Sequence, residues 1–110
     1  MKHTIDNPKL VRYWYYFEDQ ETFTGVVKDN NCIISYYLHG KNHRENGPAV
    51  ESYNGDKVWY LNGMIHRTDG PAIEYADGSK QWYLNGTHYG WNADYTNESW
   101  IRFVKLEFLK

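Results

Sequence analysis

The side chains best suited to chemistry are His43 and His66, each followed directly by an arginine. His66 also precedes Asp69 by three residues, so the two could imitate part of a hydrolytic triad. Such a triad needs a Ser or Cys nucleophile at a matched position, and no such residue recurs beside either histidine. Cys32 falls in an expected strand, where a cysteine usually acts as a small hydrophobe. The sequence therefore gives little indication of an enzyme, and we expect no catalytic residues.

A shared metal site is also disfavoured by spacing. His43 and His66 lie one 23-residue period apart, and neighbouring hairpins of a sheet place such residues roughly 10 Å apart. Zinc ligands lie at about 2 Å from the metal, so one ion could not bridge the pair. We therefore expect no metal and no cofactor. We expect each imidazole to be structural and to hydrogen-bond a backbone carbonyl.

Glu51 and Glu74 could serve as the paired carboxylates of glycoside chemistry. The same spacing has a simpler explanation, because each glutamate follows an arginine, Arg44 or Arg67, by seven residues. Cross-strand ion pairs of this kind are common. We therefore interpret the glutamates as partners of the arginines.

The elements that would position these side chains form an internal repeat. Residues 36–90 repeat with a period of 23 residues. Positions in register include Gly40, Gly63 and Gly86; Arg44 and Arg67; Gly47-Pro48-Ala49 and Gly70-Pro71-Ala72; and Tyr36, Trp59 and Trp82. A fixed period of this length indicates units that bury their apolar face only against a neighbour.

Turn dipeptides divide each repeat into strands. Asn54-Gly55 and Asp77-Gly78 favour two-residue type I′ hairpin loops, and the Asn-Gly pairs at 62–63 and 85–86 mark further turns. A two-residue loop at 77–78 would set Ile73 opposite Trp82. The alternation then predicts a buried face and a polar face. The buried face holds Val50, Trp59, Leu61, Ile73, Trp82 and Leu84, and the polar face holds Arg44, Glu51, Tyr60, Arg67, Glu74 and Tyr83.

The two ends of the chain complete a single domain of residues 1–110. Residues 1–35 resemble degenerate strands of the array, with strands expected at 10–17, 22–28 and 32–38. Residues 36–90 hold the clear repeats, and residues 91–110 close the array. A helix is expected from residue 97 to 110, with Thr96 or Asn97 as its N-cap. The predicted fold is mainly β, an antiparallel meander of stacked hairpins with a short C-terminal helix.

The units N-G-x-x-H-R-x-[ND]-G-P-A-x-E and [ND]-G-x-K-x-W-Y-L-N-G resemble variant MORN repeats. The resemblance covers about half the chain, residues 36–90, and extends to small hypothetical proteins of bacteria and their phages. It implies a scaffold of stacked β-hairpins used for binding, without catalytic residues to carry over. H-R-x-x-G-P-A stands where the usual pattern has H-G-x-G, so a lipid role does not carry over. A phage origin would imply an inhibitor or adaptor acting on a host protein, such as an anti-defence protein.

Composition and charge limit the binding partners and the cellular compartment that we expect for the protein. The formal net charge of −2 gives no general attraction to nucleic acid or to an anionic bilayer. A single cysteine suits a reducing cytoplasm. The first residues lack the apolar core of a signal peptide, and no run is long enough for a membrane span. We expect a cytoplasmic protein.

The expected function is binding of another protein. Tyrosine and arginine are enriched at interface hot spots. The candidate contact residues are Tyr37, Tyr60, Tyr83, Arg44 and Arg67 on the sheet. Leu106 and Leu109 on the helix form a competing surface for a partner or for a second copy of the chain. The alternatives are a small hydrolase or nucleotide-binding protein with a pocket at His66, Arg67 and Asp69, and a structural component that assembles through its end strands.

Overall fold

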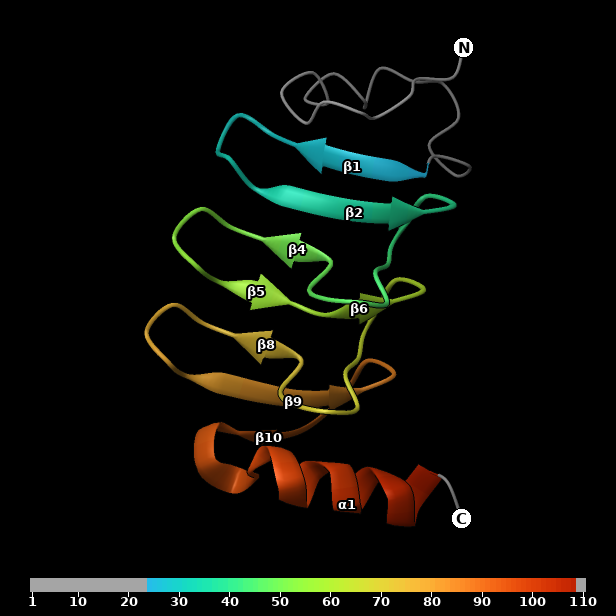
Figure 1. Ribbon diagram of the computed structural model, residues 1–110, viewed down its shortest axis with the longest axis vertical. Coiled ribbons are helices and arrows are strands. Elements are labelled where there is room, and N and C mark those ends of the chain that lie inside the picture. Colours follow the sequence, from blue (N-terminus) through green and yellow to red (C-terminus); the bar gives the residue numbers. More distant parts are fainter. Residues whose placement is uncertain (1–23, 109–110) are drawn as a thin grey trace.

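The computed structural model describes residues 24–108. The predicted strand at 10–17, the first two residues of the strand predicted at 22–28, and Leu109 and Lys110 lie outside the described residues. The described chain is mainly β, an antiparallel hairpin meander that ends in one α-helix, as predicted (Figure 1).

One sheet contains eight strands in the order β1-β2-β4-β5-β8-β9-β10, with β3 paired to β2, and a second sheet pairs β6 with β7. The strands are β1 Gly25–Lys28, β2 Ile34–Leu38, β3 Lys41–Asn42, β4 Val50–Glu51, β5 Lys57–Val58, β6 Tyr60–Leu61, β7 Met64–Ile65, β8 Ile73–Glu74, β9 Lys80–Leu84 and β10 Thr87–Trp91. A 3-10 turn, Asn92–Asp94, leads to helix α1, Asn97–Phe108. Within residues 24–108, no helix is long and apolar enough to cross a membrane.

Two kinds of turn alternate along the meander. At 39–40, 62–63 and 85–86 both residues have positive φ, as in Asn62 (52°) and Gly63 (83°). The pairing of Leu61 with Met64 across the second of these turns leaves a two-residue loop. These are type I′ turns, whose twist matches that of the flanking strands. The predicted pairing of Leu61 with Met64 is confirmed.

The loops at Asn54-Gly55 and Asp77-Gly78 are different, and the two-residue prediction for them is wrong. Each glycine has positive φ, 107° and 93°, but the residue before it does not. Glu51 pairs with Lys57, and the Gly55 N–H donates to the Ser52 carbonyl at 3.0 Å. This is a three-residue loop with the glycine in a bulge. The Asp77 carboxylate accepts the Ser79 N–H at 2.9 Å, which fixes the corresponding loop.

The additional loop residue shifts the register by one and changes which side chains share a face. Ile73 lies opposite Gln81, not Trp82, and Val50 lies opposite Val58, not Trp59. Residues that pair directly lie on the same side of the sheet. Val50, Val58 and Ile73 therefore point away from Trp59 and Trp82, which corrects the predicted apolar stripe.

Glu51 and Glu74, which were predicted on the polar face, lie on the opposite face for the same reason. Glu51, Lys57, Glu74 and Lys80 pair in sequence across β4, β5, β8 and β9, so their charges alternate in one row. We call this side, which also holds Trp59, Leu61, Trp82 and Leu84, the tryptophan face. The other side, which holds Tyr37, Tyr60 and Tyr83 together with Val50, Val58 and Ile73, is the tyrosine face.

The described core lies where α1 covers the tryptophan face of the last strands (Figure 1). Trp82, Leu84, Trp100 and Val104 form a buried cluster, and Trp82 and Trp100 are 1% and 0% exposed. Their ring centroids are 5.3 Å apart. Large aromatic rings bury more apolar area than aliphatic side chains do and contribute strongly to the stability of a core.

The helix begins as predicted, with Thr96 as the N-cap. The Ser99 N–H donates to Thr96 Oγ1 at 3.0 Å, and the Thr96 N–H donates to Ser99 Oγ at 2.9 Å. This reciprocal pair satisfies the first free N–H groups of the helix. Cys32 differs from the prediction: it lies in a turn before β2, has a φ of 62° and is exposed.

Candidate functional site

The two arginines of the repeat occupy nearly identical environments. The guanidinium carbon of Arg67 lies 3.9 Å from the centroid of the Trp59 ring, and that of Arg44 lies 4.0 Å from the Tyr36 ring. Each guanidinium is therefore stacked on the aromatic residue eight positions earlier. Such cation–π contacts contribute ~0.5 to 2 kcal/mol, depending on how far the cation is desolvated.

Each guanidinium is also held by a carbonyl and a carboxylate. Arg67 Nη1 donates to the Pro71 carbonyl at 3.1 Å and to Glu74 Oε2 at 2.9 Å. Arg44 Nη1 makes the corresponding bonds to Pro48 at 3.1 Å and to Glu51 at 3.3 Å. The predicted ion pairs with the glutamates are thus present. Because these pairs lie on the tryptophan face, the prediction that the arginines line up beside the tyrosines is wrong.

The glycine of the G-P-A segment makes room for this arrangement. A Cβ at Gly70 would lie 2.8 Å from the Arg67 guanidinium carbon, and one at Gly47 would lie 3.2 Å from that of Arg44. The alanines that follow, Ala49 and Ala72, are both 0% exposed. The H-R-x-x-G-P-A-x-E pattern thus describes one packing unit.

The histidines connect successive hairpins, which agrees with a structural role but not with the predicted carbonyl partner. His43 Nδ1 accepts the Asn62 N–H and His66 Nδ1 accepts the Asn85 N–H, each at 2.9 Å. A ring nitrogen that accepts a hydrogen bond carries no proton, so the neutral ring holds its proton on Nε2. Burial lowers the pKa of His66, which favours this neutral form.

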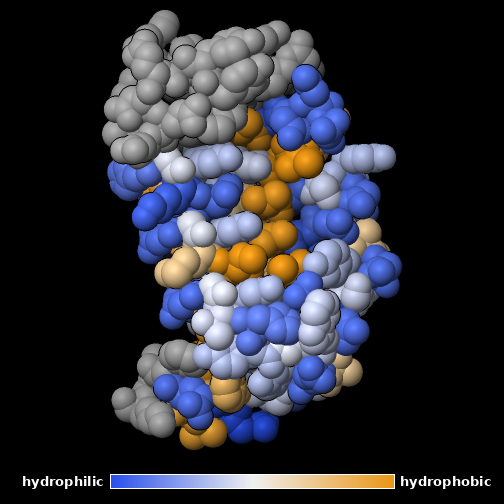
Figure 2. Space-filling model, turned by 180° about the vertical axis from the view of Figure 1, so that it is seen from behind, coloured by the Kyte–Doolittle hydropathy of each residue, from blue (hydrophilic) through white to orange (hydrophobic). Residues whose placement is uncertain are grey.

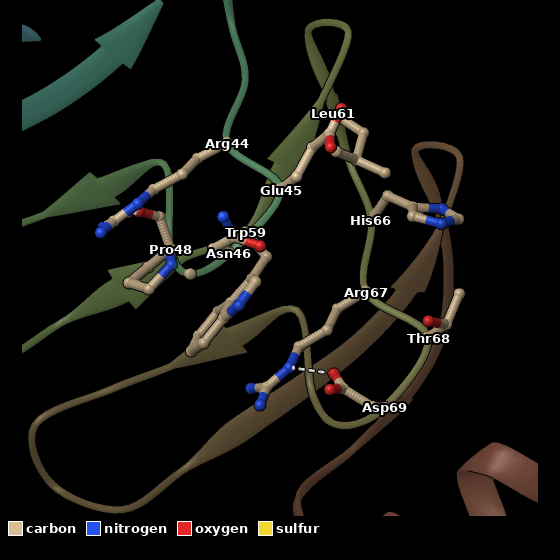
Figure 3. A pocket seen from close by; sticks show the side chains of 11 residues that line it. Arg44, Glu45, Asn46, Pro48, Trp59, Leu61, His66, Arg67, Thr68 and Asp69 are labelled. Atoms are coloured by element: carbon tan, nitrogen blue, oxygen red, sulfur yellow. Dashed lines mark hydrogen bonds and ion pairs between the residues drawn. The ribbon is translucent and has the colours of Figure 1, made fainter.

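A hollow opens on the tryptophan face between the two arginine loops, and we call it the arginine hollow (Figure 3). Its volume is about 640 Å³. The loop 44–48 forms one wall, Trp59 and Leu61 lie between the walls, and residues 66–69 form the other. The hollow brings His66, Arg67 and Asp69 together, as the pocket hypothesis required.

The bonds inside the hollow leave these side chains little capacity for acid–base work. Arg67 Nε donates to Asp69 Oδ1 at 2.8 Å, so the carboxylate is directed to the guanidinium (Figure 3). His66 Nδ1 is occupied by the Asn85 N–H. Within residues 24–108 no three His, Cys, Asp or Glu side chains gather as metal ligands. The hollow therefore offers a concave shape and an aromatic surface, from Trp59, to a bound group.

The tyrosine face carries an apolar stripe that runs along the back of the sheet (Figure 2). The pairing register places Ser35, Val50, Val58, Ile73 and Gln81 in one row across the strands. Tyr37, Tyr60 and Tyr83 recur beside this row at 23-residue spacing and are partly buried. Burial raises the pKa of Tyr37, so its hydroxyl stays neutral. The structure therefore brings the three predicted tyrosines together, without the arginines.

Other residues of this face were not predicted from the sequence. Gln81 is 8% exposed; its Nε2 donates to the Tyr75 hydroxyl at 2.7 Å, and its Oε1 accepts from the Tyr83 hydroxyl at 3.4 Å. His88 lies between Tyr83 and Trp91, with ring centroids 5.0 Å from each. The sequence did contain a signal for Gln81, because a polar residue stands there at the position that Val58 holds one repeat earlier.

The helix surface is the remaining candidate. Leu106 is 63% exposed, which agrees with its predicted place outside the buried arc, and Leu109 lies outside the described residues. Comparison of the chain with models of known families, with curated proteins and with solved structures finds no match.

Proposed function

We propose that this protein is a non-enzymatic module that binds another protein through the tyrosine face. The observation that carries the proposal is the apolar stripe on the back of the sheet (Figure 2). The pairing register places Val50, Val58 and Ile73 in one row of this face, beside the tyrosines that recur every 23 residues. The centre of a protein interface is typically apolar, poor in charge and rich in aromatic residues.

The distribution of charge supports this choice of face. The row that contains the stripe includes no Asp, Glu, Lys or Arg, whereas the neighbouring residues Glu51, Lys57, Glu74 and Lys80 point to the tryptophan face. Covering the stripe would therefore desolvate no ionised group of that row, which avoids the largest cost of forming an interface. Tyrosine adds apolar area and a hydrogen-bonding hydroxyl at low entropic cost.

The resemblance to variant MORN repeats of bacteria and phages supports the same class of function. In this proposal the partner is a host protein, met in the cytoplasm, and the module inhibits it or tethers it to another component. The repeat scaffold presents its surface already ordered, so binding loses little conformational entropy.

The test begins with identifying a partner by affinity capture from the host and then measures its dissociation constant with purified variants. Tyr60→Ala/Tyr83→Ala should weaken binding by more than ~2 kcal/mol, about 30-fold, if the tyrosines are anchors. Leu106→Ser is the matched control, because it changes an exposed residue of α1. All variants are first compared by thermal melting.

The opposite pattern would refute the proposal. If the tyrosine variant binds normally and Leu106→Ser does not, the helix is the recognition element. Concentration-dependent dimerisation that the tyrosine variant abolishes would make a second copy of the chain the partner.

A further inference from the structure

Helix α1 shows what kind of side chain fits between two units of this array. Trp100 projects from the helix, is 0% exposed and packs against Trp82. Its indole Nε1–H donates to the Arg67 carbonyl at 2.8 Å. Val104, one helical turn later, joins Leu84 in the same cluster. An aromatic residue and a β-branched residue at i and i+4 thus cover a Trp-Leu pair.

The arginine hollow is the same place one repeat earlier. Subtracting 23 residues from Arg67, Trp82 and Leu84 gives Arg44, Trp59 and Leu61, all of which line the hollow. Trp82 and Leu84 are 1% and 2% exposed beneath α1, whereas Trp59 and Leu61 are only partly buried. No donor among residues 24–108 hydrogen-bonds the Arg44 carbonyl, the counterpart of the one that Trp100 occupies.

The two places differ in the wall formed by residues 67–72, because all six residues of the corresponding segment 90–95 are different. Gly90 stands where the earlier unit has Arg67, whose guanidinium covers one side of the Trp59 ring. The remaining volume of about 640 Å³ is still ample for an indole ring. Both guanidiniums are already paired with Glu51 and Glu74, which argues against an anion as the natural occupant.

The charges at the rim of the hollow indicate which charge a partner should carry. The side chains of Glu45 and Asp69 are 76% and 72% exposed at the mouth of the hollow. Basic residues that flank an inserted ring would lie near these carboxylates. The attraction would favour a basic helix over an acidic one.

We infer that the arginine hollow is a docking site for an amphipathic, basic helix of a partner protein, which inserts a tryptophan between the Arg44 and Arg67 loops. The inserted indole N–H bonds to the Arg44 carbonyl, and an aliphatic residue one turn later covers Leu61. This site is separate from the tyrosine face and independent of it.

A synthetic peptide with the sequence of residues 95–108 and the changes Glu98→Gln and Glu107→Gln is a suitable probe, because it keeps Trp100 and Val104 and its remaining charged side chains, Arg102 and Lys105, are both basic. It is added to the full-length protein labelled with ¹⁵N, and the indole N–H resonances of the tryptophans are followed. The Trp59 indole should shift saturably, and the W100A peptide should bind at least roughly tenfold more weakly. Raising the salt concentration should weaken binding.

Variants of the protein locate the bound peptide. Leu61→Asp should abolish binding, and Thr68→Trp, at an exposed position of the rim, should block the hollow even if Leu61→Asp fails to fold. Tyr60→Ala, on the opposite face, should bind the peptide like the wild type. The inference is overturned if no saturable shift appears up to about 1 mM peptide, or if only the Trp82 and Trp100 indoles respond, because the peptide would then be displacing α1.

Discussion

The glycine before each proline offers a quantitative test of the arginine packing. In Gly70→Ala the new Cβ would lie 2.8 Å from the Arg67 guanidinium carbon, a distance that real Cβ atoms do not tolerate. The guanidinium must move away from Trp59 and from the Pro71 carbonyl. We expect losses of ~1 kcal/mol for the cation–π contact and ~1 kcal/mol for the hydrogen bond. The corresponding decrease in melting temperature is roughly 8 to 16 °C for a domain of this size.

Gly47→Ala is the matched comparison, since its Cβ would lie 3.2 Å from the Arg44 guanidinium carbon. A shift of a few tenths of an ångström would relieve that contact, so we expect no more than about half the effect of Gly70→Ala. Both variants are measured by urea unfolding, which reports the free energy of unfolding directly.

A double-mutant cycle decides whether the guanidinium is responsible. In an Arg67→Ala background, Gly70→Ala meets no guanidinium and should be neutral or stabilise by ~0.4 to 1 kcal/mol, because alanine restricts the unfolded chain. A loss of stability that persists in this background would refute the reasoning and would mean that the backbone itself requires glycine.

Three further predictions concern other contacts. Burial lowers the pKa of His66 below its unfolded value of about 6.5, so the contribution of this group to the free energy of unfolding is complete above that pH and decreases as the pH falls below it. Urea unfolding at pH 7.5 and 5.5 should show this decrease, and a His66→Gln variant should reduce the slope. Gly78→Val should lower the melting temperature, because Gly78 has a φ of 93°, which a β-branched residue rarely adopts. Nothing lies within 4 Å of the added Cβ, so the decrease would come from backbone strain alone, and an unchanged melting temperature would contradict the bulge assignment. Trp100→Ala should cost ~3 to 5 kcal/mol by opening a cavity against Trp82, measured by the same unfolding assay, and a loss below 1 kcal/mol would exclude α1 as part of the core.

Local signals predicted much of the fold. The Asn-Gly pairs at 62–63 and 85–86 fixed type I′ turns, and Thr96 marked the start of α1, because both features depend on neighbouring residues alone. The same dipeptide logic failed at Asn54-Gly55 and Asp77-Gly78. There the side chains of Asn54 and Asp77 hydrogen-bond backbone N–H groups two residues later and stabilise a longer loop.

The candidate site was harder to predict because one loop residue decides which face each side chain occupies. The tyrosines and arginines of the repeat were placed together from alternation, but Arg44 and Arg67 follow the ends of β3 and β7 and lie outside any strand, where alternation does not apply. The contact of Arg67 with Trp59 joins residues eight positions apart through the sheet, and no local pattern encodes it. The histidine partners required knowledge of which hairpin follows in space.

The direction of the histidine bonds bears on how such a chain can change its length. Each imidazole accepts from the asparagine 19 residues later, so every hairpin is fastened to the one that follows it. Each arginine finds its ring, proline and glutamate within its own unit. A tandem duplication of 23 residues would therefore reproduce both sets of bonds at the new junction, and the array could gain or lose units by unequal recombination while α1 still closes the last one.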